Sequence, residues 1–333
     1  MASATSLKSS KRWLDDRSVQ NHFYQLSATT LQKGPRGVHY CFLTAFFCSD
    51  IDTFRASAPT GRLGVHIVKP IIACIVESLQ VLHSLKIVHA DIRSDNILFP
   101  GPSTARVEKE VSRIPPLVEG ALTLDGTQYP ILRSQPFQTL LSWNVTPYIA
   151  ETIMVILNTL GSAFWAVGPK PLGDIGVFAL RAPENIIRAE CGKEIDIWAI
   201  GCMTYELITG ESLFRPQDTL GLTPDESLLL LQFNVTGETL SKDTLDQSRV
   251  RDKFFNPEGG FIKSSTNVYP TDQSIKERLT ERCGGDLTER RINAAARFIS
   301  DCLRLSPRDR PTVKELRMHS WLSMAFMVCA DHD

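Results

Sequence analysis

Residues 87–99 read IVHADIRSDNILF, and this stretch decides how the rest of the chain is interpreted. His89 is followed by Asp91 two positions later and by Asn96 after five more, between two apolar segments typical of strands. A carboxylate on such a loop can orient a hydroxyl group, while an amide oxygen can hold a cation on phosphates. For so short a motif alone, an ordinary polar loop is the favoured interpretation, so the function depends on more distant segments.

Three further segments stand downstream in a consistent order. They are RAPE at Arg181–Glu184, DIW followed by Gly201 at Asp196–Gly201, and RDRPT at Arg308–Thr312. Together with the first stretch they resemble the catalytic loop and the supporting segments of protein kinases. Chance is a poor explanation for four such segments across one chain.

The resemblance is closest to the SR-protein kinase branch. GPRGVHYCFLTAF (34–46) is similar to two strands of that group, and LGSAFW (160–165) to its metal-binding loop. LRAPENII (180–187) and DIWAIGCMTYELITGESLFRP (196–216) are similar to the segment and helix that follow. The resemblance implies an α+β, protein-kinase-like fold with a mainly helical C-terminal lobe and only a β-hairpin remnant of the N-terminal lobe. It also implies ATP and Mg²⁺ as cofactors, although their binding by this chain is in doubt.

The same resemblance assigns roles by position. Asp91 is expected to act on the substrate hydroxyl, Arg93 to contact phosphate and Asn96 to bind metal. The expected nucleotide contacts are Thr44, Ala45, Phe47, Leu98 and Thr159, and the expected structural residues are His89, Gly161, Glu184, Asp196 and Arg310. Arg310 is expected to pair with Glu184, and Asp196 to accept hydrogen bonds from the backbone of the catalytic loop.

Several positions depart from the family pattern. Aligned on LGSAFW, Thr159 stands where a metal-binding aspartate is expected, and using Asn158 instead would need a register slip. Ala90 replaces the arginine that, in the kinases it resembles, usually binds a phosphorylated activation loop. No G-x-G-x-x-G occurs in the 333 residues, and neither does a V-A-I-K lysine; counting back from residues 38–47 places these features before residue 1. Phosphoryl transfer is therefore expected to be impaired.

Periodicity outlines the organisation. Residues 21–47 predict two strands around a turn at 34–37, and apolar residues at three- and four-residue steps predict a helix over 66–85. Residues 100–150, rich in proline and without a sustained period, predict an insertion in which VEKE (107–110) is interpreted as a solvated charge cluster rather than a short helix. Further helices are expected at 195–209, 225–232, 289–303 and 312–326. The predicted domains are 1–55, a remnant of the N-terminal lobe with the hinge, and 56–327, the C-terminal lobe.

Composition narrows the setting. A net charge of −1 gives no argument for nucleic acid or for an anionic membrane, and the eight scattered cysteines predict reduced thiols in a cytoplasmic or nuclear protein. Residues 1–13 lack the apolar core of a secretory signal. The uncharged stretch Thr152–Gly168 is short for a membrane span, and two buried strands around a turn are the favoured interpretation. The expected partner is a protein, with Arg/Ser-rich segments as one possibility, and neither nucleic acid nor a membrane.

Three functions compete on this evidence. The first is a serine/threonine kinase of the SR-protein type that uses Asp91. The second is a pseudokinase scaffold that binds a partner without chemistry. The third is the product of an incomplete gene model whose upstream part carries the remaining kinase motifs. Intact Asp91 and Asn96 favour the first hypothesis, and Thr159 and the missing lobe oppose it. An upstream coding segment with the missing motifs would support the third, although Thr159 would remain.

Overall fold

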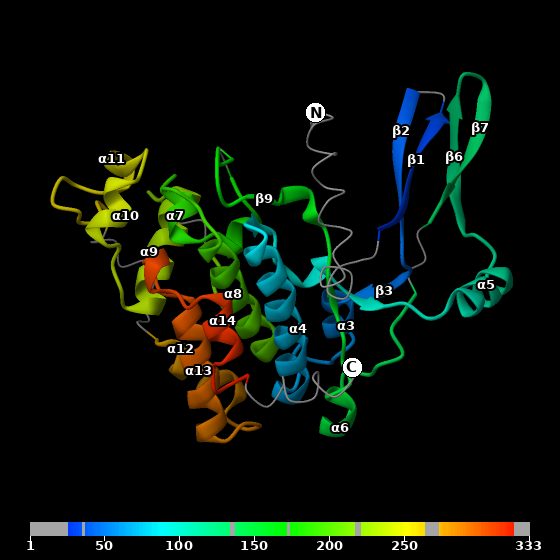
Figure 1. The fold of residues 1–333 in the computed structure, drawn as a ribbon. Coiled ribbons are helices and arrows are strands. Elements are labelled where there is room, and N and C mark those ends of the chain that lie inside the picture. The colour runs from blue at the N-terminus through cyan, green and yellow to red at the C-terminus, as the bar shows by residue number, and fades with distance from the viewer. Residues whose placement is uncertain are drawn as a thin grey trace.

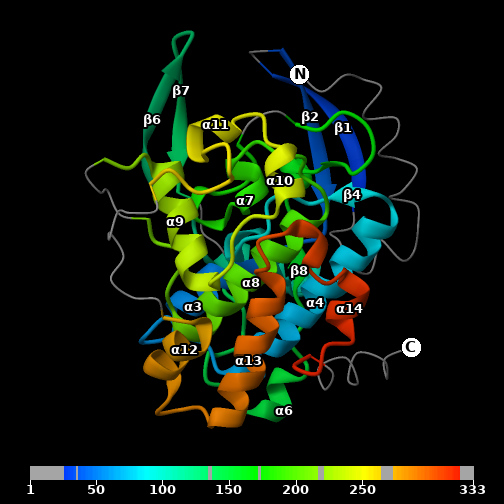
Figure 2. The same ribbon diagram turned by 90° about the vertical axis from the view of Figure 1, so that its left-hand side faces the viewer.

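A bundle of helices forms the body of the protein, and helix α8 (Glu194–Thr209) runs through its centre (Figures 1 and 2). Nearly every residue of α8 is buried, as expected for a helix that is apolar on all sides. It packs against α4 (Val65–Ser84), α12 (Ile275–Cys283) and α13 (Glu289–Cys302). The computed structural model describes residues 26–34, 37–133, 137–171, 174–216, 221–263 and 273–322.

Helix α4 is the predicted helix of residues 66–85, and its position within the core is confirmed. Its apolar side chains from Ile67 to Leu82 are almost completely excluded from solvent. Among the described residues, α4 is the one helix long and apolar enough to cross a membrane, and 61% of its most apolar window is buried inside the protein. Burial of this kind is what a core helix requires, so the length of α4 is weak evidence for a membrane.

Short strands carry the candidate site. Strands β3 (Phe47–Asp50), β5 (Ile97–Pro100) and β8 (Ile156–Leu157) form one antiparallel sheet in the order β3-β5-β8. Strand β4 (Ile87–Val88) pairs separately with β9 (Phe164–Trp165). The loop that carries the HxD…N motif therefore leaves β4 and returns to β5. The stretch 152–168 does form two strands around a turn, although each strand pairs with another partner and Trp165 is 48% exposed.

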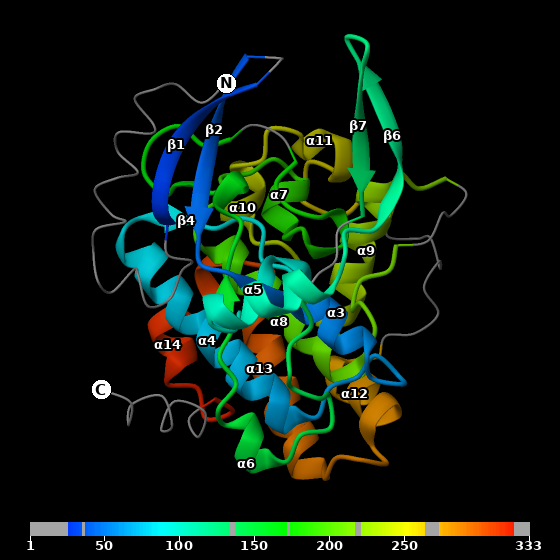
Figure 3. The ribbon, with the colours of Figure 1, turned by 90° about the vertical axis from the view of Figure 1, so that its right-hand side faces the viewer.

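Two β-hairpins project from the same end of the body (Figures 1 and 3). The first, β1 (Leu26–Gly34) with β2 (Gly37–Thr44), confirms the predicted hairpin, whose residues 21–25 and 35–36 lie outside the described residues. The second, β6 (Val118–Leu124) with β7 (Thr127–Leu132), lies within the predicted insertion and was not foreseen. A two-stranded hairpin is only marginally stable by itself.

The charge-cluster interpretation of residues 107–110 was wrong, because they belong to helix α5 (Thr104–Arg113). No residue of α5 is fully buried, so its charges are solvated while its backbone is helical. The helices predicted at 195–209, 225–232 and 289–303 are all present. The last predicted helix is shorter than expected: α14 covers Val313–Arg317, and the predicted residues after Leu322 lie outside the described part.

The remaining elements connect these parts. They are α3 (Ile51–Ala56), η1 (Ser94–Asn96), α6 (Pro147–Ala150), η2 (Leu160–Ser162), η3 (Phe178–Leu180), α7 (Pro183–Ile186), α9 (Pro224–Thr236), α10 (Lys242–Asp246), α11 (Arg251–Phe254) and η4 (Pro307–Asp309). The mixed α/β fold agrees with the class expected from the sequence. The seven cysteines within the described residues are free thiols.

Candidate active site

Asp196, in the first turn of α8, holds the loop between β4 and η1 in place. Its side chain is buried, and its Oδ2 accepts hydrogen bonds from the His89 backbone N–H and from Nε2 of His83, both at 2.9 Å. Its Oδ1 accepts a bond of 2.8 Å from the backbone N–H of Ala90. Ala90 has a φ of 67°, so the backbone turns sharply at the point that Asp196 fixes. The bracing expected of Asp196 is therefore present in the geometry.

His89 connects the loop to the strand beside it. The side chain is fully buried; its Nε2 lies 2.9 Å from the carbonyl oxygen of Asn158, and its Nδ1 accepts a 3.2 Å bond from the Asp91 N–H. One ring nitrogen must donate and the other accept, which defines a neutral imidazole protonated at Nε2. Burial lowers the pKa of His89 and favours this neutral form. The ring thus serves as a spacer between two backbone segments.

Asp91 and Asn96 form the polar centre of the loop. The Nδ2 of Asn96 donates to Oδ2 of Asp91 at 2.8 Å and to its carbonyl oxygen at 2.9 Å. Both side chains are half-buried. Since the amide nitrogen of Asn96 is committed to Asp91, its Oδ1 faces elsewhere and accepts no hydrogen bond within the described residues. The loop therefore offers one carboxylate oxygen and one amide oxygen to a ligand.

Arg93 is paired with a neighbouring carboxylate. Its guanidinium forms a two-point ion pair with the carboxylate of Asp95, two residues away. This hydrogen bond also raises the pKa of Arg93, so the side chain remains charged. A phosphate group would have to compete with Asp95 for the guanidinium.

Four of the residues expected to contact a nucleotide lie on or beside strands β2, β3 and β5. Thr44 and Ala45 lie exposed at the end of β2, while Phe47 pairs with Pro100 at the other end of β5 from the loop. Leu98 is half-buried on β5. The segment between β2 and β3 is fixed by a 2.9 Å hydrogen bond from the Gly101 N–H to the carbonyl oxygen of Phe46. A Cβ at Gly101 would meet that oxygen at 2.3 Å, so glycine is required there.

Thr159 directly follows the residue that pairs with the end of the catalytic loop. In the pairing of β5 with β8, Ile97 lies opposite Leu157, and the Asn158 N–H donates to the Asn96 carbonyl oxygen at 2.8 Å. The backbone of Asn158 is thus paired with that of Asn96, which leaves the expectation for the side chains of residues 158 and 159 as a prediction. Thr159 comes one position later, with a left-handed φ of 65° and an exposed side chain.

Gly161 does not show the structural role expected of it. Its φ lies outside the left-handed region, and a Cβ at this position would meet no atom within 4 Å. Neither backbone conformation nor packing therefore requires glycine at residue 161.

Glu184 and Arg310 form the ion pair that the resemblance implies. The two guanidinium nitrogens of Arg310 donate to the two carboxylate oxygens of Glu184 at 2.6 and 2.7 Å. The side chains are 1% and 0% exposed. Arg310 also donates to the carbonyl oxygens of Arg304 and Glu194 and lies 5.0 Å from the ring centre of Trp198. All of these contacts of Arg310 lie inside the protein, so the ion pair connects α7 to the segment before α14.

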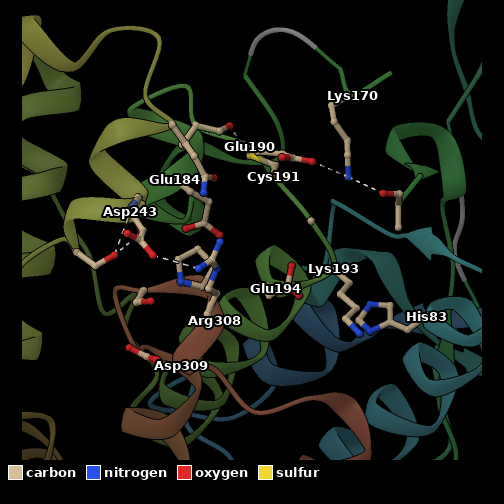
Figure 4. Close-up of a pocket in the computed structure, with 18 of the residues that line it drawn as sticks. His83, Lys170, Glu184, Glu190, Cys191, Lys193, Glu194, Asp243, Arg308 and Asp309 are labelled. Carbon is tan, nitrogen blue, oxygen red and sulfur yellow. Dashed lines mark hydrogen bonds and ion pairs between the residues drawn. The ribbon is translucent and has the colours of Figure 1, made fainter. Parts of the chain in front are cut away.

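A cavity of about 610 Å³ opens beside this pair (Figure 4). Charged side chains line it, but they are largely matched by neighbours: Arg308 donates to Asp243 at 3.1 Å, and Lys170 to the carbonyl oxygen of Ala166 at 2.7 Å. Burial raises the pKa of Cys191 to about 12, so its thiol is a poor nucleophile. The cavity therefore shows no arrangement suited to catalysis.

The loop rather than the cavity is suited to Mg²⁺. No group of three or more His, Cys, Asp or Glu side chains within the described residues could hold a metal ion. Magnesium prefers oxygen ligands and is commonly bound through one or two carboxylates together with substrate phosphates. Asp91 and Asn96 supply the oxygen atoms that Mg²⁺ prefers, so the residues present fit the ion. They carry only one negative charge between them, so they attract it weakly.

Comparison with known proteins finds similarity to protein kinases. Residues 174–322 match the protein kinase domain family. The probable serine/threonine-protein kinase sky1 of Dictyostelium discoideum is 31% identical over 50% of this chain and 24% of its own length. The serine/threonine-protein kinase SRPK of Physarum polycephalum is 23% identical over 88% of this chain and 69% of its own length. SRSF protein kinase 3 of Mus musculus is 29% identical over 57% of this chain and 33% of its own length. The chain thus spans a third or less of two of these relatives.

Proposed function

We propose that this chain is a protein kinase of the SR-protein kinase type whose catalytic loop transfers phosphate from ATP to serine with reduced efficiency. The observation that carries this proposal is the loop geometry: Asp91 and Asn96 joined by a 2.8 Å hydrogen bond, on a backbone held by Asp196. Catalysis of phosphoryl transfer depends mainly on positioning and on electrostatic stabilisation. A loop held in this way, with a free carboxylate oxygen, can supply the positioning.

In the proposed reaction each residue keeps one task. Asp91 accepts a hydrogen bond from the serine hydroxyl and orients its oxygen toward the γ-phosphate. Asn96 would offer its Oδ1 to Mg²⁺, which, when bound, neutralises charge on the phosphates. Arg93 can assist only after leaving Asp95. Thr44, Ala45, Phe47 and Leu98 are the proposed nucleotide contacts.

Reduced efficiency follows from the missing acid. Neither Asn158 nor Thr159 carries a carboxylate, so the strand beside Asn96 supplies no charged ligand to the proposed metal site. Removal of a charged group that stabilises a transition state costs several kcal/mol, and each ~1.4 kcal/mol is a tenfold change in rate. We therefore expect slow transfer.

The setting of this reaction follows the relatives. We propose that β1–β2 is the remnant of an N-terminal lobe, with residues 1–55 as one domain and 56–327 as the catalytic lobe. An Arg/Ser-rich protein is the proposed substrate, since two of the relatives are named for SR proteins. A cytoplasmic or nuclear location is part of the same proposal.

A binding scaffold is the second candidate. One face of the β1–β2 hairpin carries Leu31, Val38 and Tyr40, each more than half exposed. Exposed apolar surface of this kind is typical of interaction sites. A scaffold requires neither ATP nor the Asp91 carboxylate.

The melting temperature of the purified chain, with and without millimolar ATP and Mg²⁺, separates the two candidates. A ligand at about 100 times its Kd adds about 2.7 kcal/mol to the stability of the native state, which gives a visible shift. The kinase proposal predicts a rise that is specific for ATP over an equal concentration of pyrophosphate. A folded protein whose melting temperature ignores ATP would favour the scaffold.

A further inference from the structure

We infer that a cavity at the end of the body opposite the two β-hairpins binds a small organic phosphate, a phosphate monoester with an apolar body (Figures 1 and 2). The cavity has a volume of about 730 Å³, within the range typical of ligand sites. It lies between α6, the beginnings of α4 and α13, and the segment that follows α14. No residue of the catalytic loop lines it, so the inference does not rest on the proposed function.

Three cationic side chains line the cavity without a counter-ion among the described residues. They are Lys69 on α4 and Arg290 and Arg291 in the first turn of α13. Lys69 is half-buried. Burial lowers the pKa of Lys69, and the positive charge of Arg291 lowers it further, so the two cations repel each other. An anion bound between them would turn this repulsion into two attractions.

The beginnings of two long helices add partial positive charge to the same space. Helix α4 starts at Val65 and α13 at Glu289, and the residues before them, Gly64 and Thr288, cap neither first turn with a side-chain hydrogen bond. Gly64, Val65 and Thr288 line the cavity, so both helix ends border it. The first N–H groups of a helix lack acceptors within the helix, and the helix dipole favours an anion there. Phosphate groups are commonly bound in this way.

Trp321 contributes an unpartnered donor and part of an apolar wall. It lines the cavity, its residue is 2% exposed, and its indole Nε1 has no hydrogen-bond acceptor in the part of the chain that the structure describes. A phosphate oxygen is the kind of acceptor that such a buried N–H lacks. The Nζ of Lys69 lies 5.6 Å from the centre of the Trp321 ring. Pro147, Leu287 and Ala294 extend the wall, which leaves room for an apolar body attached to the phosphate.

The acidic groups nearby already have partners. Asp286, the one acid among the described residues that line the cavity, lies 2.8 Å from Arg62. Glu289, in the first turn of α13, contacts Lys276 at 3.4 Å. The unmatched charge of the cavity is therefore positive, and it exceeds what one carboxylate can neutralise. A phosphate monoester brings about two negative charges and three strong acceptor oxygens.

Isothermal titration calorimetry with naphthyl phosphate, which joins a dianion to an aromatic body, tests the inference. Lys69→Gln and Arg291→Gln should each weaken binding by about tenfold or more, because each removes a donor for charge-assisted hydrogen bonds. The matched control is Arg297→Gln, which removes the same charge from α13 outside the cavity and should change the affinity by less than about twofold. Inorganic phosphate should bind more weakly than naphthyl phosphate, because it leaves the apolar wall uncovered.

The stability of the ligand-free protein provides a second measurement. Lys69 is half-buried beside Arg291 without a counter-ion among the described residues, so Lys69→Gln should leave the melting temperature unchanged or raise it. A lower melting temperature together with weaker binding would show that Lys69 supports the fold and would contradict its assignment to the site.

Three further results would overturn the inference. The first is a folded, unchanged chain that gives no heat of binding with millimolar naphthyl phosphate. The second is a loss in Arg297→Gln as large as that in Arg291→Gln, which would show unspecific attraction by the whole surface. The third is equal affinity for inorganic phosphate and naphthyl phosphate, which would exclude a role for the apolar wall. Asp91→Ala should bind naphthyl phosphate as the unchanged chain does, so failure of this inference and failure of the kinase proposal can be distinguished.

Discussion

Replacing Arg310 by methionine should destabilise the protein severely. The substitution leaves the Glu184 carboxylate, which is 1% exposed, without its cation, and removes the donors that the carbonyl oxygens of Arg304 and Glu194 use. Stranding one partner of a buried ion pair typically costs about 3–5 kcal/mol. Since the free energy of unfolding of a whole domain is about 5–15 kcal/mol, this single substitution should remove a large part of it.

Urea denaturation followed by circular dichroism measures the loss as a lower midpoint at unchanged slope. Arg308→Met is the matched control: the neighbouring arginine pairs with Asp243 on the surface, where the two side chains are 73% and 69% exposed. A pair of that kind is worth less than about 1 kcal/mol. The double variant Glu184→Leu/Arg310→Met should recover much of the loss, because it leaves no buried charge.

Two outcomes would refute this reasoning. If Arg310→Met cost no more than Arg308→Met, the pair would have to be solvated rather than buried. If the loss in free energy of unfolding in the double variant exceeded the sum of the losses in the two single variants, the penalty would not come from a stranded charge.

Further predictions concern the backbone and the loop. Gly101→Ala should cost about 1–3 kcal/mol in urea denaturation, because its Cβ would meet the Phe46 carbonyl oxygen at 2.3 Å, whereas Gly161→Ala should be neutral within about 0.5 kcal/mol. Thr159→Gly should stabilise the protein by about 0.5–1 kcal/mol in the same assay, because a β-branched residue is strained at a φ of 65°. His89 has a lowered pKa in the folded state, so the unfolded chain binds the proton first as the pH falls below about 6.5. Stability should therefore decrease from pH 7.5 to 5.5, and a folded His89→Gln variant should show a smaller decrease.

Helices with a clear apolar period were predictable from the sequence. The steps of three and four residues in residues 66–85 and 289–303 reflect burial of one helix face, and both helices are present. Residues 118–132 gave no such signal, because the β6–β7 hairpin buries no face and so needs no periodic pattern. The charge-rich helix α5 was missed for the same reason.

The candidate site was predictable where hydrogen bonds follow from residue identity. An aspartate at the start of α8 and the Glu184–Arg310 pair could be expected from their motifs, and both make the expected contacts. The backbone pairing of Asn158 with Asn96 could not, because it depends on the register of β5 with β8, and no residue type in that short stretch specifies the register. The left-handed turn at Thr159 likewise has no signal in the sequence.

Transfer of radiolabelled phosphate from ATP to a peptide of Arg-Ser repeats tests the central claim most directly. The account predicts slow incorporation into serine that Asp91→Ala abolishes and that Asp125→Asn, a comparable change in the β6–β7 turn, leaves unchanged. Incorporation that persists in a folded Asp91→Ala variant would contradict the account. So would a complete lack of transfer by the unchanged chain, a result that would leave the braced loop as part of a binding scaffold.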